Sequence, residues 1–229
     1  MDRARLEAFS DGVFAVAITL LALDLAVEGP GHGTTLLQQL GHRWPAYAAY
    51  VVSFFVIGVL WVNHHSLFGQ IARVDRALLF ANLLLLLFVV AIPFITSTLA
   101  EYLLDGGQDA RVAAVLYAVV MEGMGLSFSL MFVHVVRADL LLVPLTPEAS
   151  RAAIVRFGLG GVAYLVAIVG AFLWAPFVLV VAGGITGYYI VERVPSDPSG
   201  ASADPAPVES VPEVTGPDGR VTDAGDATD

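Results

Sequence analysis

The feature that most constrains this chain is a series of long apolar stretches without a charged residue. Residues 44–62 and 77–99 are two of them. Each is close to the roughly 20 residues that a helix needs to cross a hydrocarbon core. Because no water is available there, the backbone must bond to itself, as it does in a helix. Only 14% of the residues are charged, against about a quarter in soluble domains. The sequence therefore predicts an all-α integral membrane protein.

Six membrane helices are predicted along the chain. The first four cover residues 8–27, 44–62, 77–99 and 112–136. Residues 157–191 then form a run of 35 uncharged residues, which is too long for one crossing. Trp174, Ala175 and Pro176 lie in its middle, where an interfacial aromatic and a helix breaker favour a turn. We therefore divide this run into a fifth helix and a short sixth helix.

The distribution of arginine sets the expected orientation. With six helices, nine arginines fall on one side of the membrane: Arg3, Arg5, Arg73, Arg76, Arg137, Arg151, Arg156, Arg193 and Arg220. Only Arg43 and Arg111 fall on the other side. Basic residues are enriched in cytoplasmic loops. We therefore expect a multi-pass protein of the cell membrane with both termini in the cytoplasm.

The last part of the chain differs in composition from the rest. Residues 194–229 hold eight acidic residues and one basic residue, Arg220, so they carry −7 of the net charge of −10. They are also rich in Pro, Ser, Ala and Gly, and such a segment cannot bury enough apolar surface to fold. We expect residues 1–193 to form one membrane domain and residues 194–229 to form a disordered, acidic, cytoplasmic tail.

Two connections are predicted to contain short helices. The first is residues 34–40, in the loop that follows the first membrane helix. The second begins after Thr146, whose hydroxyl can cap a short helix that leads into the fifth membrane helix.

Ionisable side chains inside a membrane are functional candidates, because they are costly there. Asp11 directly follows Ser10 and lies less than two helical turns from Arg5, so these three side chains could form a local network. Ser10 or Asp11 could equally cap the N-terminus of the helix, and Arg5 could lie among lipid headgroups. The spacing leaves both interpretations open.

Two histidines, His64 and His65, follow Trp61 and Asn63 at the end of the second membrane helix. Adjacent residues of a helix point in different directions, and no H-x-x-x-H pair or carboxylate lies nearby in the sequence, so we do not expect a metal site. We expect instead that Asn63 or His64 forms hydrogen bonds with the Arg5–Asp11 end of the first helix. Both groups belong at the same face of the membrane.

Glu122 lies near the middle of the fourth membrane helix. It could be a proton or cation site, as acidic residues are in transporters. It could also pair with Asn82 of the third helix, or lie at an interface between copies of the chain. The sequence does not separate these alternatives.

The first helix also carries an apolar stripe. Val16, Leu20, Leu23 and Val27 follow one another at helical spacing, and Thr19 lies beside them. Such stripes usually face lipid or a neighbouring helix, so periodicity alone gives this one no further role.

Sequence patterns of catalysis are missing from the chain. It contains no G-x-S-x-G, no H-E-x-x-H and no phosphate-binding glycine loop. Without cysteine, it has neither a disulfide nor a thiolate metal site. We therefore expect no enzyme activity and no cofactor.

Read together, Arg5, Phe9, Ser10 and Asp11 closely resemble the first-helix signature R-x-x-x-F-S-D of the transmembrane protein 175 family. These proteins are potassium channels of animal endolysosomes and of prokaryotes. The segment Trp61-Val-Asn-His-His-Ser-Leu-Phe68 and the six helices with both ends inside support the resemblance. Animal members carry two six-helix repeats, whereas this chain carries one, so it looks like a prokaryotic member that assembles as a tetramer.

The resemblance implies a pore on the four-fold axis, lined by four copies of the first helix. The family's pore constriction consists of large apolar side chains, and its positions correspond to Val16, Leu20 and Leu23. Val16 is one methylene smaller than the isoleucine usual in the family. Thr19 corresponds to a threonine linked to potassium preference. The remaining motif residues would hold the first helix against its neighbours: Arg5, Phe9, Ser10, Asp11, Trp61, Asn63 and His64.

The resemblance therefore implies a potassium-preferring cation channel with a hydrophobic constriction. Its expected partners are potassium ions, membrane lipid and other copies of itself, and no nucleic acid. The main alternative is a secondary or proton-coupled transporter in which Glu122 and Asp11 titrate, although the chain lacks inverted repeats. A third is a membrane scaffold that transports nothing and binds partners through its acidic tail.

Overall fold

The computed structural model describes residues 2–25 and 35–191, apart from the side chains of Asp24, residues 156–159 and Val191. Its elements are α1 (Arg3–Leu20), the 3-10 helix η1 (Leu21–Leu25), α2 (Leu36–His42), α3 (Trp44–Gly69), α4 (Arg76–Tyr102), α5 (Gly107–Arg137), α6 (Pro147–Leu173) and α7 (Phe177–Val191). The described part contains no strand, and only Ile71 and Leu141 form an isolated bridge. The all-α prediction is confirmed. Val27 and the predicted acidic tail lie outside the described residues.

Five of these helical stretches are long and apolar enough to cross a membrane: Arg3–Leu23, Trp44–Gly69, Arg76–Tyr102, Gly107–Arg137 and Pro147–Leu173. Helix α7 has 15 residues and is therefore about 22 Å long, shorter than a hydrocarbon core of about 30 Å. The predicted break is confirmed, because α6 ends at Leu173 and α7 begins at Phe177. A count of six crossings and the cytoplasmic position of both termini stay predictions.

Local signals explain where several helices begin. The side chains of Asp2, Thr35, Asp75 and Thr146 each accept a hydrogen bond from a backbone N–H in the first turn of the helix that follows. Such caps replace the partners that the first N–H groups of a helix lack. Thr35 also forms a capping box with Gln38. The short helix predicted within residues 34–40 is thus present as α2.

Several predicted boundaries are wrong. Helix α1 begins at Arg3 rather than near residue 8, and α5 begins at Gly107 rather than near residue 112. The first α-helix ends at Leu20 and continues as η1, so Leu23 lies in a tighter 3-10 turn, which is frequent at helix ends. Helix α3 continues to Gly69 because no glycine or proline lies between Val62 and Gly69, so His64 and His65 lie inside the helix. Thr146 caps α6 itself rather than a separate short helix. No proline lies between Pro147 and Leu173. The backbone groups of this apolar stretch must bond to one another inside a membrane, so the helix continues without a break.

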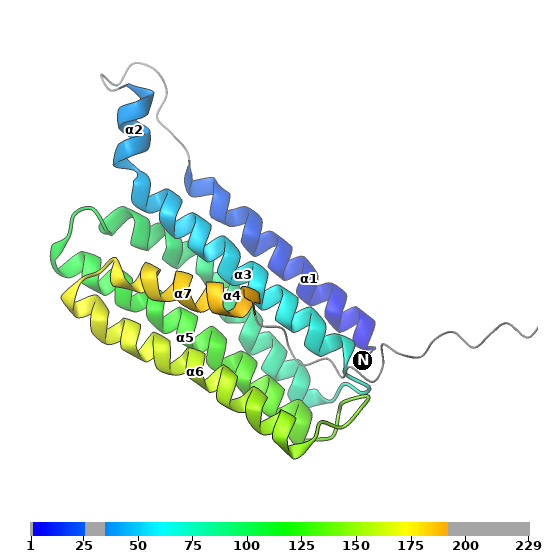
Figure 1. Cartoon of the computed structure of the whole chain (residues 1–229). Helices are drawn as coiled ribbons and strands as arrows, with labels where there is room; N and C mark the ends of the chain where they lie inside the picture. The colour runs from blue at the N-terminus through cyan, green and yellow to red at the C-terminus, as the bar shows by residue number, and fades with distance from the viewer. Residues whose placement is uncertain (1, 26–34, 192–229) are drawn as a thin grey trace, which may run out of the picture. The chain divides into compact units, whose positions relative to one another are not determined.

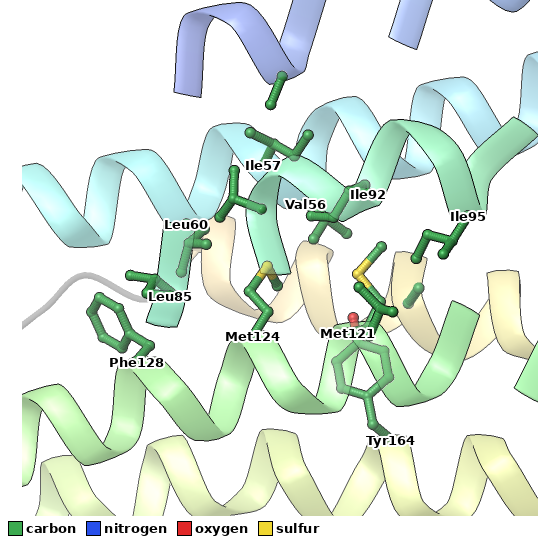
Figure 2. Close-up of a cluster of buried hydrophobic side chains, with 14 of the residues drawn as sticks. Val56, Ile57, Leu60, Leu85, Ile92, Ile95, Met121, Met124, Phe128 and Tyr164 are labelled. Atoms are coloured by element: carbon green, nitrogen blue, oxygen red, sulfur yellow. The ribbon is translucent and has the colours of Figure 1, made fainter. Parts of the chain in front are cut away.

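The helices pack around α4, which contacts α1, α3 and α5. Helix α6 packs against α5, while α7 packs against α3, α5 and α6. Figure 1 shows α1 and α6 at opposite edges of this arrangement. The core consists of apolar side chains from several helices, such as Ile57 of α3, Ile92 of α4 and Met121 of α5 (Figure 2). As an edge helix, α1 is covered on one side only.

Candidate functional site

One face of α1 is buried within the chain. Its members recur every three or four residues and are at most 2% exposed: Leu6, Ser10, Phe14, Ala17 and, in η1, Leu21. This spacing is that of one helical face, and it packs against α3 and α4. The buried face is apolar except for one hydroxyl group, that of Ser10.

The opposite face of α1 is apolar but exposed. Val16 is 56% exposed, Leu20 39% and Leu23 70%. Thr19 is exposed beside them, and its hydroxyl donates to the Val16 carbonyl over 2.8 Å. In a membrane protein, such a face lies either against lipid or against another protein surface. The residues that the resemblance assigns to the pore therefore have no cover from the described part of the chain.

A buried chain of hydrogen bonds joins α1, α4 and α3. The Asn82 amide donates to the Ser10 hydroxyl over 2.9 Å, and the Asn82 carbonyl oxygen lies 2.8 Å from His64 Nε2. Ser10 in turn donates to the Leu6 carbonyl of its own helix. All three side chains are 0% exposed. Buried polar groups are costly without partners, so this chain of bonds favours one position of α1 against α3 and α4.

Two aromatic rings contact the His64 imidazole. Phe68 stacks on it with ring centroids 4.1 Å apart, and Phe14 of α1 lies tilted at 5.3 Å. The Nδ1 atom of His64 is buried and has no hydrogen-bond partner within the described chain. His65 points elsewhere, with its Nδ1 3.0 Å from a carboxylate oxygen of Glu7. The two histidines therefore attach α3 to α1 at two different places.

Asp11 is held by a residue 50 positions away. The indole Nε1 of Trp61 on α3 donates to Asp11 Oδ1 over 2.8 Å. Trp61 also stacks on His65, with ring centroids 5.9 Å apart. The Asp11 carboxylate is thus engaged across the helix interface, rather than with Arg5.

Three residues expected in the network take no part in it. Arg5 is exposed and forms no hydrogen bond or ion pair in the described chain. Phe9 is 52% exposed. The Asn63 amide donates to the Val59 carbonyl of its own helix over 2.8 Å. The local network of Arg5, Ser10 and Asp11, one of the two interpretations that the spacing left open, is therefore wrong, because Ser10 and Asp11 each bond to a different neighbouring helix.

Two residues with positioning contacts were missed from the sequence. Asn82 was considered only as a partner of Glu122, although an amide inside an uncharged stretch signals a need for partners. The sequence indicates Arg3 only as one of the arginines that set the orientation in the membrane. Its Nη1 donates to the carbonyls of Gly69 and Ile71 over 3.3 and 3.1 Å. Arg3, rather than Arg5, thus ties the start of α1 to the end of α3.

The α3–α4 connection, to which Arg3 bonds, also forms hydrogen bonds with the segment that follows α5. Ala72 N–H donates to the Leu140 carbonyl, and Leu142 N–H donates to the Gln70 carbonyl, each over 2.7 Å. Asp75 pairs with His134 of α5, with His134 Nε2 2.9 Å from Asp75 Oδ2. The backbone N–H of Leu78 lowers the pKa of Asp75 below its usual value, and His134 lowers it further. The start of α1 is therefore linked to α5 through the α3–α4 connection.

Glu122 lies on α5, away from this network. Its Oε2 is buried without a hydrogen-bond partner in the described chain. Its Oε1 lies 3.1 Å from the point that a Cβ on Gly161 would occupy. The suggested pair between Glu122 and Asn82 is wrong, because Asn82 bonds to Ser10 and His64.

The chain is similar to proteins of one family. The model of the family described as endosomal/lysosomal potassium channel TMEM175 matches residues 5–93. A potassium channel of Streptomyces collinus is 48% identical over 198 residues, which cover 85% of this chain and 94% of that protein. The endosomal/lysosomal proton channel TMEM175 of Homo sapiens is 34% identical over 127 residues, or 51% of this chain and 25% of that protein.

A solved structure gives the same result for the fold. The crystal structure of a lysosomal potassium-selective channel TMEM175 homolog from Chamaesiphon minutus matches with a TM-score of 0.72 and 36% identity. The match covers 82% of this chain and 96% of that chain. From the identity, the coverage and the shared fold, the chain belongs to the TMEM175 family of channels, which are not enzymes.

Proposed function

We propose that this chain is a potassium-permeable membrane channel whose pore is lined by the exposed face of α1. The relatives that match most of the chain are named potassium channels, which supports the permeant ion. One observation of the molecule carries the proposal for α1: Val16, Leu20 and Leu23 remain exposed on a helix whose other face is locked to α3 and α4. A helix held in this way presents a fixed apolar surface to a partner.

Four copies around an axis would turn this surface into a constriction. Rings of Val16, Leu20 and Leu23 would oppose a hydrated cation, and such hydrophobic constrictions can gate by losing their water. We assign both termini to the cytoplasm and the chain to the plasma membrane, following the arginine distribution. The alternative cover for this surface is lipid, which any exposed apolar face of a membrane helix can take.

Thr19 is the polar group of the proposed pore surface. Its hydroxyl proton is directed to the Val16 carbonyl, so its oxygen lone pairs are free to accept from water or to approach a cation. We assign Thr19 to potassium preference on this basis.

Replacing the apolar rings tests the proposal. We expect Leu20→Ser and Leu23→Ser to raise potassium flux into liposomes about tenfold, as a barrier lower by about 1.4 kcal/mol does. Leu165→Ser is the matched control, since Leu165 of α6 is 55% exposed and lies outside the proposed pore. Unchanged flux in both α1 variants, or an equal rise in the control, would remove α1 from the pore.

The same liposomes distinguish the channel from a proton-coupled carrier. A channel gives unitary currents in a potassium gradient and keeps them in Glu122→Gln. A carrier that uses Glu122 and Asp11 gives slow, saturable, pH-coupled flux, which Glu122→Gln abolishes. The oxygen of Glu122 without a partner is the observation that makes this comparison necessary.

A further inference from the structure

A cavity of about 90 Å³ lies between α3, α5, α6 and α7, apart from the polar network of α1. Its walls include Val56, Leu60, Phe128 and Ile185, together with the polar residues Asn63 and Tyr164. The volume exceeds the roughly 30 Å³ that one water molecule occupies in the liquid. The lining residues fall near the middle of three helices that can cross a membrane. A ligand therefore reaches this cavity through the bilayer.

Glycines leave the space open. Gly125, Gly160 and Gly161 line the cavity from α5 and α6. A Cβ on Gly160 would lie 3.0 Å from the Tyr189 hydroxyl, and one on Gly161 would lie 3.1 Å from Glu122 Oε1. A Cβ on Gly125 would meet no atom within 4 Å. Gly125 is thus the lining glycine at which a Cβ displaces no neighbour.

Two polar groups of the cavity have unused hydrogen-bonding capacity. Tyr164 is only 5% exposed, and its hydroxyl forms no hydrogen bond in the described chain. Figure 2 shows its side chain pointing from α6 toward Met121 and Met124 of α5. Asn63 is 8% exposed. Its amide nitrogen is bonded to Val59, and its carbonyl oxygen has no partner in the described chain. Both residues line the cavity, so it offers a carbonyl oxygen and a hydroxyl group to a complementary polar ligand atom.

We propose that this cavity binds a small membrane-soluble amphiphile that has an aliphatic body and a single hydroxyl group, of the medium-chain alcohol class. A hydroxyl group both donates and accepts, so it can donate to the Asn63 carbonyl or accept from the Tyr164 hydroxyl. The aliphatic body fits the apolar walls. A lipid acyl chain would leave both polar groups without partners. Water would keep the apolar walls in contact with a polar solvent, which is unfavourable. The proposal does not depend on the channel function.

Photolabelling tests the proposal on the full chain in lipid nanodiscs. The probe is 3-azioctanol, a diazirine analogue of octanol, and labelled residues are mapped by peptide mass spectrometry. We expect saturable labelling of Tyr164 or its neighbours on α5 and α7, displaced by excess 1-octanol. Gly125→Leu should reduce this labelling severalfold. Gly184→Leu is the control, because a Cβ on Gly184 also meets no atom within 4 Å and Gly184 does not line the cavity.

Two further variants complete the test. Gly125→Val replaces Gly125→Leu if the larger side chain prevents folding, which thermal unfolding of each sample reports. Tyr164→Phe should retain the cavity but raise severalfold the octanol concentration that halves the labelling. Labelling that does not saturate, that spreads over exposed residues such as Leu165 and Val166, or that persists in both Gly125 variants would overturn the proposal.

Discussion

The two faces of α1 have similar apolar side chains but different surroundings. On one face, Leu6, Phe14 and Ala17 are at most 2% exposed, and Ser10 bonds to Asn82 of α4. On the other, Val16 and Leu23 are more than half exposed. Contacts among the described residues therefore account for the position of α1 but leave its second face without cover. The difference teaches that the positioning residues and the proposed ion-facing residues are separate sets on one helix.

The largest effect should follow from removing the polar link of the buried face. In Asn82→Leu, both Ser10 and His64 lose a buried partner, and each such loss costs about 1–3 kcal/mol. We expect the free energy of unfolding in detergent to fall by about 3 kcal/mol. Ser66→Ala is the matched control, because it removes a hydrogen bond made within α3 alone. Equal losses of stability in the two variants would show that the bonds of Asn82 to Ser10 and His64 contribute no more than a hydrogen bond within one helix.

A smaller effect is expected on the exposed face. Thr19→Val keeps the shape of the side chain and removes its hydroxyl group, so folding should not change. The ratio of potassium to sodium permeability should fall by less than about tenfold, which corresponds to about 1.4 kcal/mol or less. Bi-ionic reversal potentials measure this ratio. A loss of stability with unchanged selectivity would instead move Thr19 into the set of positioning residues.

The smallest effect concerns the anchor of α1 at its first turn. Arg3 bonds to the α3–α4 connection, which Asp75 and His134 join to α5. The folded pKa of Asp75 is lowered, so its contribution to stability is full above its unfolded pKa of about 4. That contribution is lost as the pH falls through the lower folded value.

This pH dependence can be measured by acid unfolding. We expect Asp75→Asn to be slightly less stable than the parent chain at neutral pH, and to lose less stability below about pH 4. Asp109→Asn, in the first turn of α5, serves as the control. An identical acid response of Asp75→Asn and the parent chain would exclude Asp75 as a source of acid sensitivity.

Much of the fold was predictable because its signals are local. Long uncharged runs predicted the helices, and Trp174 with Pro176 predicted the break before α7. The contacts of the site were less predictable, because they join residues far apart in the sequence. Asp11 follows Ser10 directly, yet the first bonds to Trp61 and the second to Asn82. Spacing could not choose Arg3 over Arg5, since both lie in the first turn and only packing separates them.

The resemblance supplied what periodicity could not. Apolar spacing selects Val16, Leu20 and Leu23 as one stripe, but the spacing is the same whether the stripe faces lipid or a pore. The structure adds that this stripe is exposed while the opposite face is buried. Its assignment to a pore follows from the resemblance to the family.

The most direct test is cysteine accessibility along α1, because the natural chain contains no cysteine. Single variants Leu20→Cys, Leu21→Cys and Leu165→Cys would be treated with a charged, membrane-impermeant thiol reagent during potassium current recording. If α1 lines the pore, modification changes the current only in Leu20→Cys, since Leu21 is buried and Leu165 lies on α6. A current that responds in Leu165→Cys, and not in Leu20→Cys, would contradict the assignment of α1 to the pore.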